Sequence, residues 1–295
     1  MKLFALVAGM LLGLNAMACD VCGAVNSALG LGTVAAGNRH AIGCTYQYRS
    51  YKSNHPGIFN EPAVSSSERF QRLDLNGTIR LASRWQLKVS LPLVYNEQTK
   101  EGVHSFRQGM ADPMLTGHYF AVNRMDSTGN KVIRLSIGGG VKMPFARFPE
   151  PDNELLLLYP GTGTWDGMLQ SSFFLRKNKW ALIQENNLML RGTNKYAYQP
   201  GNLFSSTLYG MRRFSNWSIF GGFQYAWNGI DYQDRKAINS SPSEGTILSA
   251  TLGGTIQWGN IMVQANYHLP IAQNLGNGYV QQQIGFTAGV YYLFN

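Results

Sequence analysis

The sequence predicts an all-β fold, a transmembrane antiparallel up-and-down β-barrel of about 12 strands. Segments of about ten residues alternate apolar with polar side chains, so each has one face for lipid and one for a lumen. Tight connections alternate with long ones, as periplasmic turns alternate with outer loops in such barrels. The last segment, 278–295, is much longer than a typical strand of a soluble protein and ends in aromatic residues.

The composition is consistent with a membrane barrel. Charged residues are 14% of the 295 residues, against about 25% in soluble domains. The net charge of +9 could suggest a nucleic-acid partner, but no Lys/Arg cluster forms a helix face or a tail. A basic surface near anionic lipid or a basic lumen explains the charge better, and no nucleic acid is expected as a partner. After residue 18 no apolar run approaches the length of a membrane helix, so a membrane location would require a closed barrel.

The N-terminal segment 1–18 has the pattern of a signal peptide. Lys2 precedes an apolar run, and Ala16-Met17-Ala18 is an A-x-A cleavage site. The following segment, 19–38, is rich in Gly and Ala and has no period. We expect it to form an arm on the periplasmic side or in the lumen. The barrel itself is predicted over 39–295.

Cys19 and Cys22 stand at the expected new N-terminus. In an oxidising periplasm they are a candidate disulfide or an incidental pair. A redox active site would need a βαβ context, and a metal site would need about four ligands, so no metal or cofactor is expected. Metal binding or redox sensing, with only His40 and Cys44 as nearby supplementary ligands, is a minor alternative, and lipidation of Cys19 is another because a cysteine follows the cleavage site.

The first half of the barrel is predicted from alternation that begins after the arm. In 68–81 leucines alternate with charged and amide residues, and Trp85 opens a strand in which Leu and Val alternate with polar residues. The segment 138–140 is three glycines in mid-strand, which indicates curvature or lumen space rather than a phosphate loop. The first six strands are predicted at about 39–51, 68–81, 85–95, 110–122, 131–143 and 165–176.

The second half repeats the pattern. In 217–228 aromatic and aliphatic residues alternate with Ser, Gly and Gln, and the neighbouring segments begin directly after short polar turns. The last six strands are predicted at about 180–191, 202–213, 217–228, 246–258, 261–269 and 278–295.

The lengths of the connections and the positions of the tryptophans both distinguish the two ends of the predicted barrel. Tight turns are predicted near 83, 126, 177, 215 and 259. Long loops are predicted over about 52–67, 96–109, 144–164, 192–201, 229–245 and 270–277. Four tryptophans lie beside short turns and two beside long loops, which predicts an aromatic girdle at each interface: Trp85, Trp180, Trp217 and Trp258, then Trp165 and Trp227. The rival fold, a secreted soluble β-sandwich, would have shorter strands and no such placement of Trp.

The last strand is expected to close the barrel by pairing with 39–51, because an open sheet edge cannot face lipid. It resembles the C-terminal assembly signal of outer-membrane barrels, with Phe294 penultimate, so the barrel-assembly machinery is an expected partner. The inward face is predicted as Gln281, Gln283, Thr287 and Tyr291. The outward face begins at Val280, with Gln282 as a polar exception near an outer interface.

Most charged residues of the strands occupy the alternate positions that are predicted to face the lumen. They are Arg49, Arg72, Asp74, Arg80, Lys88, Asp112, Arg134, Lys142, Asp166 and Glu185. One interpretation is a salt-bridge network that fills a narrow barrel. The other is a pathway for polar or anionic solutes, because a barrel of about 12 strands lies between filled small barrels and open porins.

No catalytic residues are predicted. The 5 histidines show no ligand spacing. His104 adjoins Ser105, but neighbouring residues of a strand point to opposite faces, so no nucleophile–base pair is visible.

Two segments resemble a known family. Residues 108–119, QGMADPMLTGHY, look like the G-x-G-D strand of the outer-membrane barrel family named for transport in the phenol meta-degradation pathway, with Ala111 in place of the second Gly. Residues 160–166, PGTGTWD, look like the later P-x-G-S-G-x-W-D strand entry of that family. Residues 19–23, CDVCG, followed by 46–49, YQYR, are similar to uncharacterised Bacteroidetes members.

The resemblance implies a barrel in the cell outer membrane that passes small compounds, with hydrophobic or aromatic molecules as candidates. The expected function is therefore a channel that moves a small solute passively, with access set by lumen charges and the arm. A non-conducting structural or adhesive barrel and a membrane-embedded enzyme are the alternatives. Outer-membrane lipid and lipopolysaccharide are expected to surround the barrel.

Overall fold

The computed structural model describes residues 39–55, 64–148, 158–238 and 243–295. The predicted signal peptide, the arm, Cys19 and Cys22 lie outside the described residues. No helix in the described part is long and apolar enough to cross a membrane.

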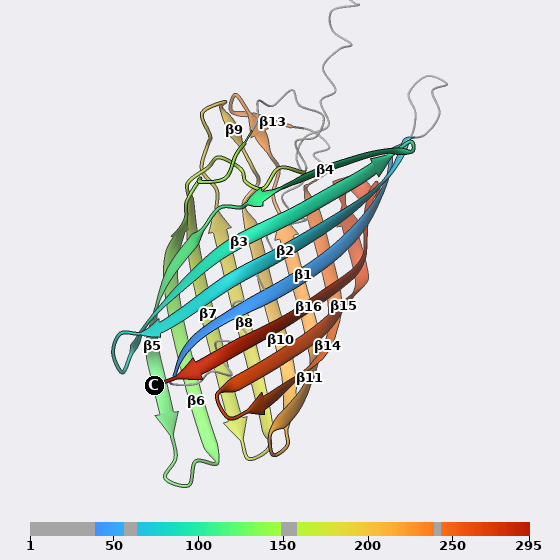
Figure 1. Ribbon diagram of the computed structural model, residues 1–295. Helices are drawn as coiled ribbons and strands as arrows, with labels where there is room; N and C mark the ends of the chain where they lie inside the picture. Colours follow the sequence, from blue (N-terminus) through green and yellow to red (C-terminus); the bar gives the residue numbers. More distant parts are fainter. Residues whose placement is uncertain (1–38, 56–63, 149–157, 239–242) are drawn as a thin grey trace, which may run out of the picture.

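Long antiparallel strands make up most of the described chain (Figure 1). The strands of the barrel wall are β1 (His40–His55), β2 (Val64–Arg80), β3 (Trp85–Lys100), β5 (Met114–Met125), β6 (Lys131–Lys142), β7 (Asp166–Lys177), β8 (Trp180–Leu190), β10 (Leu203–Arg213), β11 (Trp217–Asn228), β14 (Gly245–Trp258), β15 (Ile261–Leu275) and β16 (Val280–Phe294). A further strand, β4 (Val103–Met110), pairs with the far half of β3.

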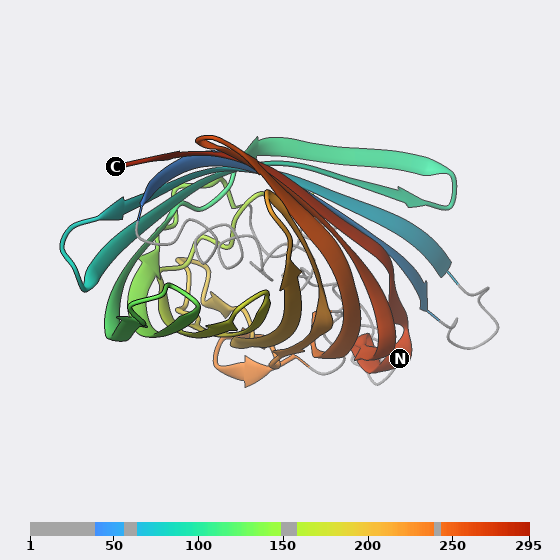
Figure 2. The same ribbon diagram turned by 90° about the horizontal axis from the view of Figure 1, so that it is seen from below.

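The sheet closes on itself. Within the described ranges it has 13 strands in the order β2-β1-β16-β15-β14-β11-β10-β8-β7-β6-β5-β3-β4, and β2 also pairs with β3. The β2–β3 pairing joins the two ends, so every strand except β4 belongs to a ring, which Figure 2 shows from below. The predicted up-and-down barrel is therefore confirmed, with β4 added.

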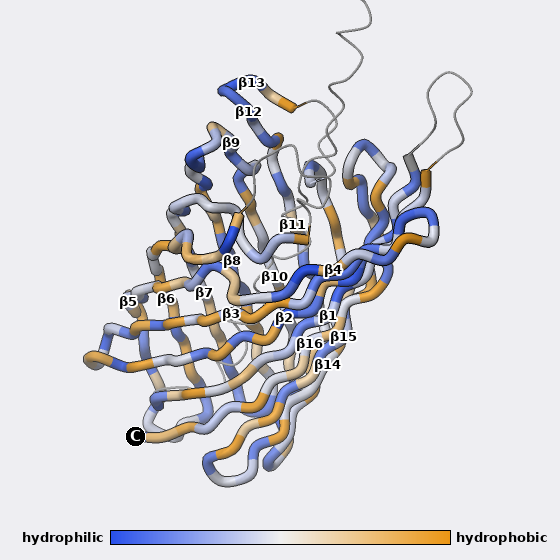
Figure 3. Tube along the Cα trace, turned by 45° about the horizontal axis from the view of Figure 1, so that its top comes forward, coloured by the Kyte–Doolittle hydropathy of each residue, from blue (hydrophilic) through white to orange (hydrophobic). Residues whose placement is uncertain are grey.

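The two faces of the wall differ as the alternation predicted, and Figure 3 shows apolar and polar residues alternating along the strands. The outward face exposes large apolar side chains such as Leu252 and Ile137, whereas Thr45 and Asp74 are buried inside. All six tryptophans are exposed, and Trp180 is 61% accessible. A closed barrel with an apolar outer belt and aromatic girdles places the protein in the outer membrane.

The tight turns are also confirmed, and they gather at the end of the barrel that holds the C-terminus (Figure 1). Three of them contain a residue with positive φ: Gly129 at 69°, Asn178 at 55° and Gly259 at 56°. Gly and Asn adopt this conformation at lower steric cost than other residues, so the turn sequences fit their geometry. This end is the periplasmic one, because short turns face the periplasm in such barrels.

The opposite end carries longer connections. A small antiparallel sheet forms there from three short strands, β9 (Tyr198–Gln199), β12 (Tyr232–Gln233) and β13 (Lys236–Ala237). A 3₁₀ turn, η2 (Gly276–Gly278), joins β15 to β16.

The predicted closure between the first and last strands is confirmed. At the N-terminal end of β16, however, the side chains point to the opposite faces from those predicted. The register between the two strands shifts between Arg49 and Tyr51, because β16 has one extra residue there. Val280 and Gln282 are therefore buried, Gln281 is exposed, and the Gln282 Oε1 accepts a hydrogen bond from Tyr51 at 3.1 Å. The predicted facing of Val280, Gln281 and Gln282 was therefore wrong. The β-bulge reverses the alternation there, which explains why Gln282 seemed to be an exception.

The predicted loop 96–109 and strand 110–122 are also corrected. β3 continues to Lys100, turns, and returns as β4. The chain then breaks at 111–113 before β5 pairs with the near half of β3. Pro113 has no N–H, yet its carbonyl accepts from Met143 at 2.9 Å, and the Ala111 N–H donates to Pro92 at 2.8 Å.

Candidate functional site

The interior of the barrel is polar and closely packed. Asp74, Ser90 and Thr116 are each 2% exposed. Small residues make room for larger ones on this face: a Cβ on Gly138 would lie 2.6 Å from the His118 ring. Gly138 therefore leaves lumen space for His118, one of the two roles predicted for 138–140, whereas Gly139 is exposed on the other face.

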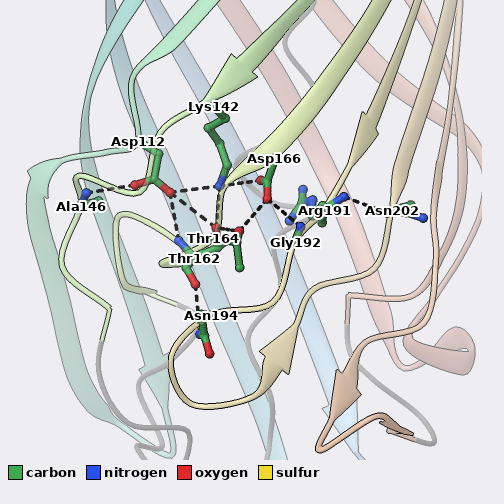
Figure 4. Close-up of polar contacts among 10 residues, drawn as sticks. All are labelled: Asp112, Lys142, Ala146, Thr162, Thr164, Asp166, Arg191, Gly192, Asn194 and Asn202. Carbon is green, nitrogen blue, oxygen red and sulfur yellow. Dashed lines mark hydrogen bonds and ion pairs between the residues drawn. The ribbon is translucent and has the colours of Figure 1, made fainter.

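A charged cluster forms where the wall is interrupted after β4, as Figure 4 shows. Asp112 lies in the break, Lys142 ends β6, and Asp166 begins β7. The Lys142 Nζ lies 3.0 Å from the Asp112 Oδ2 and 2.8 Å from the Asp166 Oδ2. All three side chains are buried, so one ammonium group is shared by two carboxylates away from water.

The loop that leads into β7 completes the cluster. The Thr162 N–H donates to the Asp112 Oδ2 at 3.2 Å, and the Thr162 Oγ1 accepts from Lys142 at 2.5 Å. The Thr164 hydroxyl donates to the Asp166 Oδ1 at 2.6 Å. These are hydrogen bonds to ionised groups, which are stronger than neutral ones.

Gly161, in the same loop, has no room for a side chain. A Cβ on Gly161 would lie 2.4 Å from the Ala146 Cβ and 2.8 Å from the Asp112 Oδ1. The Ala146 N–H in turn donates to the Asp112 Oδ1 at 2.9 Å. The Asp112 carboxylate thus ties together the break before β5 and both described ends of the β6–β7 connection.

The loop after β8 also joins this cluster. The Gly192 N–H donates to the Asp166 Oδ1 at 3.2 Å, and the Asn194 amide donates to the Thr162 carbonyl at 3.2 Å. Three connections that are far apart in the sequence therefore meet at one buried ion cluster near the outer end. The two segments that carry the family resemblance contribute Asp112 and Asp166 and are brought together here.

A second charged pair lies on β2. The Arg72 Nε lies 2.8 Å from the Asp74 Oδ1, and the Arg72 Nη2 lies 2.7 Å from the same oxygen. Asp74 also accepts from Gln47 at 3.2 Å and from Ser90 at 3.0 Å, one on each neighbouring strand. The pair therefore lies along the wall.

Lys88 and Glu185 interact electrostatically from β3 and β8, although no ion pair within 4.0 Å joins them among the described residues. Arg49 is buried and lines a small cavity with His268 and Gln224. These groups lie between the outer cluster and the periplasmic end.

Arg80 and Arg134 lie near the periplasmic end, and each is partly buried. Two more inward arginines, Arg176 and Arg213, were missed by the sequence interpretation. Arg176 could have been predicted, because it is an even number of residues after Asp166 on the same strand and therefore points to the same face. Arg213 follows Tyr209 and Met211 on the inward parity of β10, although Ser205 and Thr207 earlier on that face are polar.

Two buried acids were also missed because they stand outside the predicted strand interiors. Glu68 accepts hydrogen bonds from Ser53 at 3.2 Å and Gln98 at 3.1 Å. Asp231, in the outer loops, accepts from the Tyr198 hydroxyl at 3.0 Å. Within the described chain, no group of three or more His, Cys, Asp or Glu side chains could hold a metal ion.

Comparison with known proteins places the fold. No family model matches the sequence, and no curated protein matches it. The structure is similar to an outer-membrane channel from Pseudomonas putida F1, with a TM-score of 0.66, 14% identity, and coverage of 87% of this chain and 96% of that chain.

Two autotransporter domains are less similar. The translocator domain of NalP from Neisseria meningitidis has a TM-score of 0.43 and 12% identity, covering 88% of this chain and 89% of that one. The β domain of Bordetella BrkA has a TM-score of 0.48 and 13% identity, covering 86% and 99%. At such identities the likeness concerns the fold alone: the chain is an outer-membrane β-barrel with the fold of a solved outer-membrane channel.

Proposed function

We propose that this protein is an outer-membrane channel that lets a small solute cross passively. The observation that carries the proposal is the direction of the charged contacts inside the barrel. Arg72 bonds Asp74 on its own strand, and Lys142 bonds Asp112 and Asp166 from adjoining segments. Among the described residues these ion pairs join neighbouring positions along the wall, whereas a barrel sealed by salt bridges would have ion pairs across its lumen.

The ring size supports the same proposal. About eight strands give an interior just wide enough for side chains to fill, and this ring has more. The similar protein from Pseudomonas putida F1 is an outer-membrane channel. The proposed lumen-lining residues are Arg49, Arg72, Asp74, Arg80, Lys88, Asp112, Arg134, Lys142, Asp166 and Glu185.

The solute class follows from the resemblance of residues 108–119 and 160–166 to the phenol-pathway transporter family. We propose small hydrophobic or aromatic compounds as solutes. Lipid and lipopolysaccharide would contact the apolar belt, and the barrel-assembly machinery would recognise β16. We also propose that residues 19–38 form an arm that sets access to the lumen, and that Cys19 and Cys22 form a disulfide within it.

Conductance of the refolded protein in planar lipid bilayers tests the function. We expect discrete single-channel currents, together with release of small solutes from proteoliposomes. Absence of both, with a folded barrel shown by its heat-dependent migration on SDS gels, would reject passive transport.

A non-conducting structural or adhesive barrel is the second candidate. The dense packing of inward side chains favours it, for example at Thr45 and Asp166, each 1% exposed. The same bilayer experiment separates the two, because only a channel conducts. We assign no catalytic residue, and lipid hydrolysis by the refolded protein would contradict that assignment.

A further inference from the structure

Four arginines gather on the inward face at the periplasmic end of the lumen. Arg80 ends β2, Arg134 lies in β6, Arg176 in β7 and Arg213 ends β10. Each precedes or follows one of the short turns by a few residues. We call these four residues the arginine mouth.

Three residues of the arginine mouth have neutral side-chain or backbone hydrogen-bond partners. Arg80 donates to the Ala82 carbonyl at 3.1 Å. The other contacts are Arg134 to the Asn123 side-chain oxygen at 3.3 Å and Arg176 to the Gly129 carbonyl at 2.7 Å. Among residues that the structure describes, no carboxylate lies within 4.0 Å of any of the four guanidinium groups.

The positive charges also lie close enough to repel one another. Arg134 interacts unfavourably with Arg80 and Arg176, and Arg176 with Arg213. Ala181 separates the strands of the last two, since it lies opposite both Arg176 and Met211 and its small side chain leaves room beside it. Arg213 is exposed, but Arg80, Arg134 and Arg176 are partly buried, so solvent screens the repulsion among them less and a bound anion is favoured.

The nearby acid does not neutralise the mouth by direct contact. Asp126 is attracted to Arg176, but its carboxylate is engaged in its own turn. It accepts from the Lys131 N–H at 2.9 Å and from the Thr128 hydroxyl at 2.8 Å. Meanwhile the Arg176 Nε is buried and has no hydrogen-bond partner among the described residues.

An apolar surface adjoins the arginine mouth on the inner wall. Ile183, Tyr209 and Phe220 form a buried cluster, and the partly buried Phe174 and Met211 pack against it. The Arg134 guanidinium lies 5.6 Å from the centre of the Phe174 ring. Cationic and apolar groups therefore meet on one patch of the wall.

We propose that the arginine mouth binds a small organic anion. Its carboxylate would accept from the guanidinium forks, which match carboxylate geometry, and its apolar body would lie against Phe174 and Met211. One part of the inference rests on the proposed channel function: if the protein is a channel, its solutes include amphipathic carboxylates that leave the lumen at this end. The binding site itself does not require conduction.

Benzoate is the probe, and calorimetric titration of the folded protein in detergent is the measurement. We expect benzoate to bind at least tenfold more tightly than acetate, because acetate lacks the apolar body, and neutral benzamide not to bind. The double variant R134Q/R176Q should weaken benzoate binding at least tenfold. The matched control R84Q/R124Q removes two exposed rim arginines with the same charge change and should bind as the unaltered protein does.

Several outcomes would overturn the inference. These are no benzoate binding by the folded protein, equal affinity for acetate, or equal weakening in both double variants. Heat-dependent gel migration identifies folded samples; if R134Q/R176Q fails to fold, R134K/R176K keeps the charge and is expected to weaken binding by losing the planar forks. Unchanged binding in R134K/R176K would also count against the site.

Conductance separates this inference from the proposed function. Benzoate binding without channel currents would reject passive transport and leave the anion site standing. Channel currents with no benzoate binding would reject the anion site and leave the channel standing.

Discussion

Replacing Lys142 with Met should destabilise the outer end of the barrel strongly. The Lys142 side chain is 10% exposed, and its carboxylate partners Asp112 and Asp166 are 3% and 0% exposed. Without the ammonium group, two carboxylates would stay buried with no cation between them. Removing one partner of a buried pair costs about 3–5 kcal/mol, and the repulsion of the remaining charges adds to it. We therefore expect K142M to lower the free energy of unfolding by about 3–5 kcal/mol.

The assay is urea unfolding of protein refolded into lipid vesicles, followed by tryptophan fluorescence. K131M is the matched control, because Lys131 lies on the same strand, is exposed, and forms no ion pair among the described residues. Hydrogen exchange should report the change first at 143–148 and 158–166, the described ends of the connection that the cluster holds.

A compensating variant tests the electrostatic reasoning. Adding D112N and D166N to K142M removes both orphaned charges and should recover most of the lost stability. A loss below about 1 kcal/mol in K142M, the usual size of an exposed ion pair, would refute the reasoning. So would a triple variant as unstable as K142M alone.

Three further predictions concern the break, a turn and the arm. G161A should destabilise by about 1–3 kcal/mol through overpacking, because its Cβ would lie 2.8 Å from the Asp112 Oδ1; an unchanged urea midpoint would contradict this. The backbone N–H of Lys131 holds the pKa of the Asp126 carboxyl below its ordinary value. This turn should therefore be most stable above about pH 3.9 and loosen as the pH falls through the lower folded pKa, and a carboxyl NMR titration centred near about 3.9 would count against it. Deleting 19–38 should raise single-channel conductance if these residues narrow the lumen, and equal conductance would remove that idea.

Much of the wall was predictable from local pattern. Lipid on one side requires apolar side chains at alternate positions, so strands such as 217–228 could be placed almost to the residue. The tight turns followed from short polar segments, three of which contain a Gly or Asn with positive φ. Closure of the first strand on the last followed from the cost of a free edge in lipid.

Backbone irregularities were not predictable in the same way. The bulge in β16 changes which residues face inward without altering the composition, because its position depends on the partner strand. The break at 111–113 was hidden inside an alternating segment, although Pro113 marks its end. Both depend on pairing between strands rather than on propensity.

The charged sites show the same division. Parity assigned Asp112, Lys142 and Asp166 to one face, but their meeting around one ammonium group depended on register and on the path of two loops. Arg176 follows the apolar Phe174 on the inward face of β7, and Arg213 follows Met211 on that of β10, so neither stood among polar neighbours although parity placed Arg176 inward.

The sequence by itself determined that this protein is an outer-membrane barrel, where its short periplasmic turns lie, and how it closes. Those features depend on contacts with lipid and on local turn geometry, which each residue experiences independently of distant ones. Only the tertiary structure decided which charges meet, because a curved and tilted wall brings together residues from separate strands and loops. The outer ion cluster and the arginine mouth are products of that register.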